Sequence, residues 1–117
     1  VAPFGFGVDA APWLPQPAHW DEFTVEAQDV DPGSMLNLYR AALALRRERA
    51  DFRSDDMAPH GLDGGDVIAF TRGSGTVVVV NFGAQPVELP AGEVLLTSVD
   101  LVDGKLPQDA TAWVATG

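Results

Sequence analysis

Hydrophobic residues recur with a helical period in one stretch of the chain, DPGSMLNLYRAALALRRERADF (residues 31–52). The apolar positions on or beside one helical face are Met35, Leu36, Leu38, Tyr39, Ala42, Leu43 and Leu45. Asp31 is a suitable N-cap, and Pro32 suits the first helical position, where its missing N–H costs nothing. The pattern predicts a helix over residues 32–50, and its wide apolar face needs a large partner surface.

From about residue 64 the hydrophobic pattern changes to that of β-strands. DVIAFTR (66–72) and TVVVVNF (76–82) are joined by GSG, which predicts a hairpin. A PAG turn separates PVEL (86–89) from EVLLTS (93–98), and TAWVAT (111–116) is typical of a closing strand. Short strands with regular turns predict an antiparallel sheet or a small sandwich.

Residues 1–30 show neither period, and Pro3, Pro12, Pro15 and Pro17 interrupt them. The aromatic residues of this stretch are Phe4, Phe6, Trp13, Trp20 and Phe23. They favour a packed loop over a solvated tail, because disordered segments are poor in aromatics. The predicted order is therefore loop, helix, strands, which is the order at the tail of a barrel enzyme that ends in a β-sandwich.

The charge of the chain limits the partners that it can bind. Its 117 residues carry 17 acidic and 7 basic side chains, for a formal net charge of −10. Arg40, Arg46, Arg47, Arg49 and Arg53 concentrate the positive charge in or just after the predicted helix. The acidic remainder argues against nucleic acid and against an anionic membrane surface. A neutral ligand such as a sugar remains compatible.

The absence of cysteine excludes disulfides, thiolate chemistry and cysteine-containing zinc sites. It fits a reducing compartment, so we expect a cytoplasmic location. No apolar run reaches membrane-spanning length. The GLDGGD segment (61–66) lacks the ligand series of a calcium loop, so we expect a turn there and no metal site.

Several motifs together resemble glycoside hydrolase family 13, the α-amylase superfamily, and within it the α-glucosidases and oligo-1,6-glucosidases. The segments that carry the resemblance are PFGF (3–6), PWLPQPAHW (12–20), VEAQ (25–28), residues 31–52 and VVVVNF (77–82). The resemblance implies an α+β fragment of two parts. Residues 1–52 would be the end of a catalytic (β/α)₈ barrel, meaning the loop after the eighth strand plus the eighth helix. Residues 53–117 would be an antiparallel β-sandwich C-terminal domain.

The same resemblance implies a retaining glycoside hydrolase that acts on α-glucosides and oligosaccharides and needs no cofactor. The catalytic aspartate, glutamate and second aspartate of the family lie on earlier barrel strands, upstream of residue 1. A whole barrel needs about 250 residues, so we expect no catalytic residue in this chain and no activity from it alone. The expected partners are the remainder of the barrel and an α-linked oligosaccharide. Self-association through helix 32–50 is a further expectation.

Trp20 and His19 are the candidate substrate-binding residues, because an aromatic face suits the apolar face of a pyranose. They lie in QPAHW (16–20), where the family often has Asn-Pro-Asn-Tyr. The competing interpretation is that such aromatics pack the loop onto the barrel rim. Glu26 and Gln28 are expected to hold the loop to the barrel by hydrogen bonds.

The acidic residues of the same segment are Asp21, Glu22, Glu26, Asp29 and Asp31. A retaining glycosidase needs two carboxyl groups about 5–5.5 Å apart, which this cluster could supply by proximity. The favoured interpretation is a solvated acidic loop. The alternative function for the whole chain is a stand-alone carbohydrate-binding or structural β-domain. That function predicts an exposed aromatic strip on the sheet, whereas Phe70, Phe82 and Trp113 are better assigned to the core.

Overall fold

The computed structural model of the chain describes residue 4, residues 13–61 and residues 65–117. The chain forms two compact units, residues 1–40 and residues 41–117, and each is described by itself. Apart from Phe4, the PFGF segment lies outside the described residues, as does the middle of the predicted GLDGGD turn.

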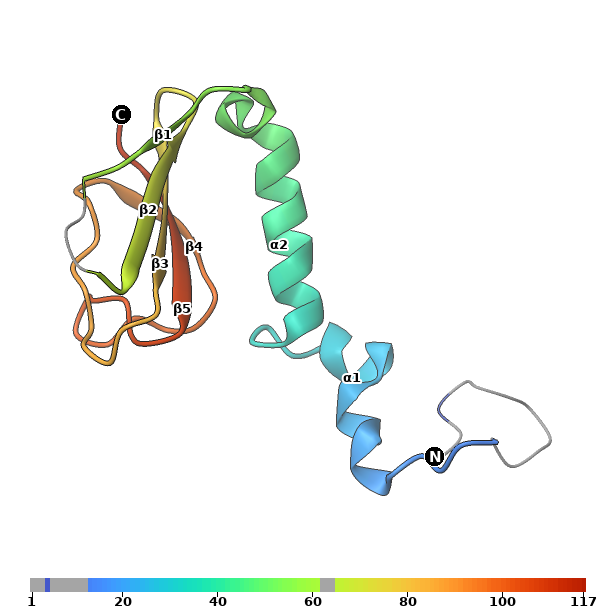
Figure 1. Ribbon diagram of the computed structural model, residues 1–117. Helices are drawn as coiled ribbons and strands as arrows, with labels where there is room; N and C mark the ends of the chain where they lie inside the picture. The colour runs from blue at the N-terminus through green and yellow to red at the C-terminus, as the bar shows by residue number, and fades with distance from the viewer. Residues whose placement is uncertain (1–3, 5–12, 62–64) are drawn as a thin grey trace. The chain divides into compact units, whose positions relative to one another are not determined.

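The first unit contains two short helical elements that precede a longer helix (Figure 1). They are the 3₁₀ helix η1 (Ala18–Phe23) and the helix α1 (Val25–Asp29). The expectation of a loop without secondary structure is therefore wrong for residues 18–29. Thr24 separates the two elements and caps α1, because its Oγ1 accepts a hydrogen bond from the N–H of Ala27 at 3.2 Å.

The long helix α2 (Met35–Glu48) begins three residues later than predicted. The carboxylate of Asp31 accepts a hydrogen bond from the Gly33 N–H at 2.9 Å, and the carbonyl of Asp31 accepts one from the Ser34 N–H at 3.1 Å. These bonds close a turn ahead of the helix. Ser34 is the residue that caps it, because its Oγ accepts from the N–H of Asn37 at 3.2 Å. The prediction of Asp31 as N-cap was wrong because the turn uses its carboxylate.

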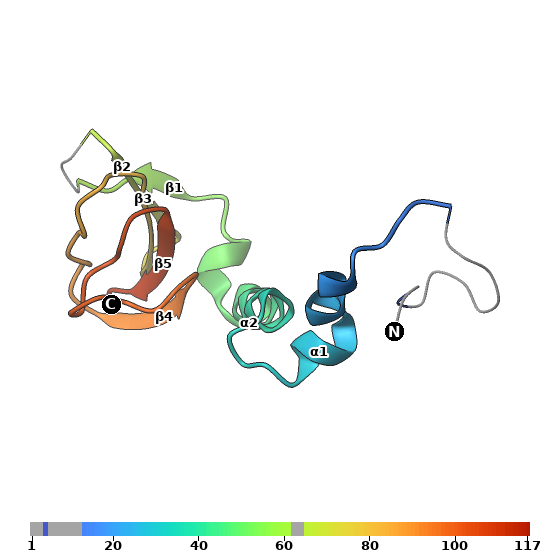
Figure 2. The same cartoon turned by 90° about the horizontal axis from the view of Figure 1, so that it is seen from below.

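The second unit is built on one antiparallel sheet with the strand order β1-β2-β3-β5-β4 (Figure 2). Its strands are β1 (Met57–Pro59), β2 (Val67–Arg72), β3 (Thr76–Asn81), β4 (Glu93–Thr97) and β5 (Ala110–Ala115). The predicted hairpin is confirmed, with Arg72 opposite Thr76 across the turn. The predicted strands near 93–98 and 111–116 are confirmed as β4 and β5.

Two details of the predicted β-domain were wrong. Residues 86–89 form no strand, and only Val87 makes an isolated bridge, to Leu106. Pro86 and Pro90 lack the N–H that a ladder would need, which accounts for the difference. The described residues form one sheet rather than two packed sheets, so the predicted sandwich is a single antiparallel sheet with a few helices.

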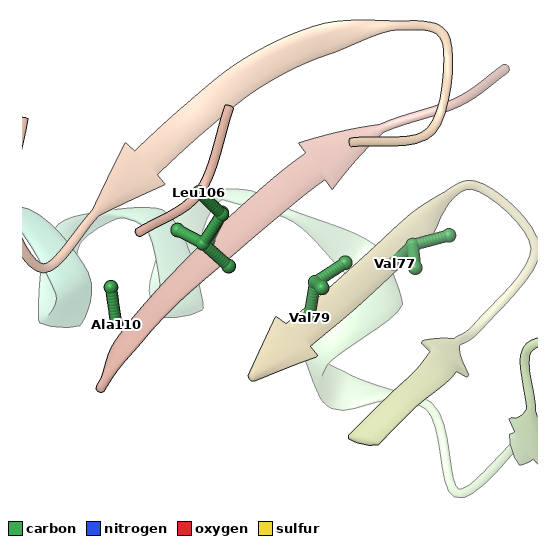
Figure 3. Packing of buried hydrophobic residues seen from close by; sticks show 5 residues of the cluster. Val77, Val79, Leu106 and Ala110 are labelled. Atoms are coloured by element: carbon green, nitrogen blue, oxygen red, sulfur yellow. The ribbon is translucent and has the colours of Figure 1, made fainter. Parts of the chain in front are cut away.

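One face of this sheet carries the hydrophobic core (Figure 3). Val77 and Val79 from β3 lie beside Ala110 and Ala112 from β5, and each is at most 2% exposed. Leu106, from the coil before β5, is fully buried over these strands. This coil and the segment around Val87 pack on the strands, so they cover the core as a second sheet would.

Asn81, at the end of β3, is a fully buried polar residue whose side chain satisfies four backbone groups. Its Nδ2 lies 2.9 Å from the carbonyl oxygen of Gln85, 3.1 Å from that of Leu106 and 3.2 Å from that of Pro107. Its Oδ1 accepts from the Gly83 N–H at 2.9 Å. The side chain therefore fastens the two core-covering coils to the central strand.

The segment between α2 and the sheet is η2 (Ala50–Arg53), which packs on the sheet of the second unit. The Asp51 carboxylate accepts from the Thr76 hydroxyl at 2.7 Å, from the Ser74 N–H at 3.2 Å and from Arg49 at 3.3 Å. Gly73 has a φ of +57°, and a Cβ there would clash with the Asp51 carboxylate. Glycine at this turn is what lets the carboxylate approach.

Phe52 follows Asp51 and lies against Trp113 of β5, with ring centroids 4.7 Å apart. Arg72 Nη2 donates to the carbonyl of Ser54 at 2.9 Å, on the same side of the sheet. The predicted domain boundary between residues 52 and 53 stays a prediction. In the structure η2, which begins before that boundary, packs on the sheet.

We expect Asn81→Ala to destabilise the chain by about 2–3 kcal/mol, because it leaves buried backbone groups without their partner. Urea denaturation followed by circular dichroism measures this. Gln85→Ala is the matched control, since Gln85 contributes only its backbone carbonyl, and its change should stay within about 0.5 kcal/mol. Equal midpoints for the two variants would contradict the role given to Asn81.

We expect the stabilisation by Asp51 to depend on pH. The Thr76 hydroxyl lowers the pKa of Asp51 below its ordinary value of 3.8, burial opposes this, and the bonds from Ser74 and Arg49 lower it further. A lowered folded-state pKa means that the contribution is complete above about pH 5 and is lost as the pH falls through that pKa.

Asp51→Asn should therefore lower the urea midpoint at pH 7, and its difference from the parent chain should shrink below about pH 4. Asp55→Asn serves as the control, because it makes the same change of charge at an exposed carboxyl nearby. A constant difference between Asp51→Asn and the parent from pH 7 to pH 3 would exclude the ionised carboxylate as the cause.

Candidate functional site

Both predicted substrate-binding residues, His19 and Trp20, lie on η1 in the first unit. The turn is closed by a hydrogen bond of 3.0 Å from the Trp20 N–H to the Pro17 carbonyl. Trp20 is 43% exposed, so its ring is open to a ligand. His19 is exposed and meets the ring of Phe23 edge to face, with centroids 6.4 Å apart.

Trp20 borders an open hollow of about 480 Å³ within the first unit. The residues that line it are Phe4, Gln16, Trp20, Phe23, Thr24 and Val25. Gln16 Oε1 is buried and has no hydrogen-bond partner among the described residues. Aromatic walls with a free amide acceptor suit a ring that carries hydroxyl groups, because the walls cover its apolar face and the amide binds a hydroxyl.

His19 is not among the lining residues, so the structure brings only one of the two predicted residues to the hollow. Gln16 and Phe23 line it without having been predicted as site residues. The aromatic content of the segment was the only feature of the sequence that pointed to Phe23. Because the segment has no periodic pattern, the sequence did not show that Phe23 and Trp20 line the same hollow.

The acidic residues of the segment do not line the hollow. Asp29 forms an ion pair with Arg40, and Asp31 closes the turn before α2. The other three acids, Asp21, Glu22 and Glu26, are exposed. Within the described ranges, no group of three or more His, Cys, Asp or Glu side chains could hold a metal ion.

A second open hollow, of about 670 Å³, lies in the second unit and is lined by Leu43, Arg46, Arg47, Phe52 and Arg53. Arg46 and Arg47 occupy the last turn of α2, where a cation meets the negative end of the helix dipole. Both side chains are exposed. None of the helices in the part of the chain described here has the length and apolarity to cross a membrane.

Comparisons with known proteins found matches that cover most of the chain. Residues 58–113 match the family model described as "Domain of unknown function (DUF3459)", which is the C-terminal domain of α-amylase-family enzymes. The chain corresponds to the C-terminal portion of a glycoside hydrolase family 13 enzyme. The predicted resemblance to that family is thereby confirmed. No curated protein matches the sequence of this chain.

Solved structures of the family share its fold. Isomaltulose synthase from Klebsiella sp. LX3 is 22% identical with a TM-score of 0.72, and the match covers 92% of this chain and 22% of that one. Trehalulose synthase from Pseudomonas mesoacidophila MX-45 is 25% identical with a TM-score of 0.69, covering 90% and 22%. Trehalose-6-phosphate hydrolase from Bacillus licheniformis is 21% identical with a TM-score of 0.68, again covering 90% and 22%. The family 13 chain thus spans about a fifth of the length of these relatives.

Proposed function

We propose that the chain is the C-terminal part of an α-glucosidase-like retaining glycoside hydrolase that acts on α-glucosides and oligosaccharides. In this proposal the piece completes the catalytic barrel and stabilises it, and the catalytic carboxylates come from the remainder of the enzyme. The similarity to an isomaltulose synthase, a trehalulose synthase and a trehalose-6-phosphate hydrolase supports a parent of this family.

The observation that carries the proposal is an apolar stripe on α2, formed by Met35, Tyr39 and Leu43. These side chains are 61%, 63% and 50% exposed, and their spacing of four residues places them on one helical face. Soluble proteins seldom leave such a stripe uncovered. Because the chain spans 22% of the length of its relatives, the rest of a barrel is the partner we propose to cover it, with α2 as the eighth barrel helix.

We further propose that Trp20 and His19 contact the substrate at the rim of the barrel. The open aromatic hollow beside Trp20 supports this, and the negative charge of the chain favours a neutral sugar over an anion. Among the relatives, an isomaltulose synthase variant from Erwinia rhapontici NX5 was solved with D-glucose, and a trehalulose synthase variant with sucrose. We also propose a cytoplasmic location, because a chain without cysteine fits a reducing compartment.

The alternative, a stand-alone carbohydrate-binding or structural β-domain, predicts an exposed row of aromatics on the sheet. Phe82 is 57% exposed, but it follows the end of β3. Phe70 and Trp113 are half-buried, and Trp113 lies against Phe52. This arrangement lends the alternative little support.

We expect the purified 117-residue chain to show no turnover of a chromogenic α-glucoside, because the proposal places the catalytic carboxylates elsewhere. Co-production with the upstream part of the enzyme should restore activity. Turnover by the chain alone, lost in Glu26→Gln or Asp29→Asn, would contradict the proposal and assign catalysis to these acids.

We expect the isolated chain to self-associate through α2, since its apolar stripe lacks the proposed partner. Leu43→Lys should lower the mass measured by light scattering at a given concentration. Val102→Lys is the matched control, because Val102 is also about half exposed, at 51%, but lies outside the stripe. A monomeric parent chain that binds no hydrophobic dye would remove the main support for the missing barrel.

In the intact enzyme we expect Trp20→Ala to raise KM about fivefold, which matches about 1 kcal/mol for a lost aromatic stack. kcat should change little, because ground state and transition state lose the same contact. Trp13→Ala is the control, since Trp13 is 95% exposed and does not line the hollow. Unchanged KM in both variants would leave packing as the role of Trp20.

A further inference from the structure

The described residues of the first unit form no apolar core. Among its described residues only Ser34 is buried, at 8% exposure, and neither η1 nor α1 has a buried residue. Among the described residues, burial of apolar side chains therefore contributes little to holding the segment that carries His19 and Trp20. Side-chain hydrogen bonds to the backbone take its place.

Gln28, in α1, connects η1 to α2 through its amide group. Its Nε2 donates to the Phe23 carbonyl at 2.7 Å, and its Oε1 accepts from the Leu36 N–H at 3.0 Å. The Leu36 N–H lies in the first turn of α2, where the helix itself offers no acceptor. One neutral side chain thus binds the end of η1 and the start of α2 at once.

Asn37, in the first turns of α2, binds the backbone that leads into that helix. Its Nδ2 lies 3.0 Å from the carbonyl oxygen of Gln28, 3.2 Å from that of Asp29 and 2.8 Å from that of Asp31. Ser34 Oγ also donates to the Gln28 carbonyl, at 2.7 Å. Figure 1 shows α1 next to the start of α2, as these bonds require.

The bonds of Gln28 reach both candidate substrate residues through Phe23. Phe23 ends η1, the 3₁₀ helix that contains His19 and Trp20, and its ring meets that of His19. Phe23 also lines the hollow beside Trp20. A displaced Phe23 carbonyl would let the whole turn move relative to α2. The exposed ion pair of Asp29 with Arg40 adds little, since such pairs contribute about 0–1 kcal/mol.

We propose that Gln28 and Asn37 are positioning residues that hold the His19–Trp20 turn in place for substrate binding. The substrate role of this turn rests on the proposed function, whereas its attachment to α2 does not. The attachment needs amide donors: a carboxylate at position 28 would face the Phe23 carbonyl with no hydrogen to donate, and a carboxylate at position 37 would face three carbonyls.

Gln28→Glu tests the attachment in the 117-residue chain labelled with 5-fluorotryptophan. We expect the ¹⁹F resonance of Trp20 to shift and to change its line width, while that of Trp113 in the second unit stays in place and reports an intact fold. Gln108→Glu is the matched control, since it makes the same change of charge at an exposed residue of the second unit.

Asn37→Asp is the second variant, because it removes the other amide donor without changing the size of the side chain. It should move the Trp20 resonance in the same way. A Trp20 resonance that is unchanged in both variants, with an unchanged Trp113 resonance, would overturn the positioning role whatever the kinetics show.

Kinetics of the intact enzyme separate this inference from the proposed function. Gln28→Glu should raise KM about fivefold, as expected for the loss of a hydrogen bond of about 1 kcal/mol, and should leave kcat within about twofold. A moved Trp20 resonance with unchanged KM would support the attachment and overturn the substrate role of the turn. A moved resonance with raised KM supports both.

Discussion

The β-domain depends on β3, a strand that is hydrogen-bonded on both edges and covered on both faces. It pairs with β2 on one side and β5 on the other, over its whole length. Val77 and Val79 point into the core, and the alternate residue Thr76, on the other face, is 1% exposed beneath η2. A run of β-branched residues is stable in such a position because both faces exclude water and every backbone group has a partner. The other strands and the two coils are arranged around this one.

Polar side chains then attach the irregular segments, in the same way at three places. Asn81 holds the coils over the core, Asp51 holds η2 to the β2–β3 turn, and Gln28 holds η1 to α2. At each place a side chain satisfies backbone or hydroxyl groups that no regular ladder reaches. Coils and short helical turns lack the repeating bonds of a sheet, so a few side chains carry much of their order. Loss of one such side chain therefore lowers the stability of its segment by more than the size of the side chain suggests.

The distribution of apolar surface accords with a piece of a larger enzyme. The sheet has a closed core on one face, whereas α2 keeps Met35, Tyr39 and Leu43 exposed. Such a stripe is unusual on a protein that stands alone, since exposed apolar surface promotes association. The rest of the barrel is the partner proposed to cover it. The turn with His19 and Trp20 would then be held at the rim by neutral amides, whose hydrogen bonds do not titrate.

The sequence by itself determined the local elements, because their signals lie within a few neighbouring residues. The period of α2, the β2–β3 hairpin and the strands β4 and β5 were all predictable, as was the family. Trp20, predicted from the sequence to bind substrate, borders the hollow, and its substrate role stays a prediction. Its neighbour Gln16 was not predictable as a lining residue, because no periodic pattern shows which side chains of an irregular segment share a face.

Only the tertiary structure decided how distant segments compete for the same partners. β4 pairs with β5 instead of with residues 86–89, and Leu106 closes the core in place of a second sheet. Ser34 caps α2 because the carboxylate of Asp31 closes the preceding turn. The first two outcomes depend on contacts between residues far apart in the chain. The third depends on which of two possible hydrogen bonds a side chain makes. A sequence pattern encodes which bonds are available, whereas packing of the whole unit selects among them.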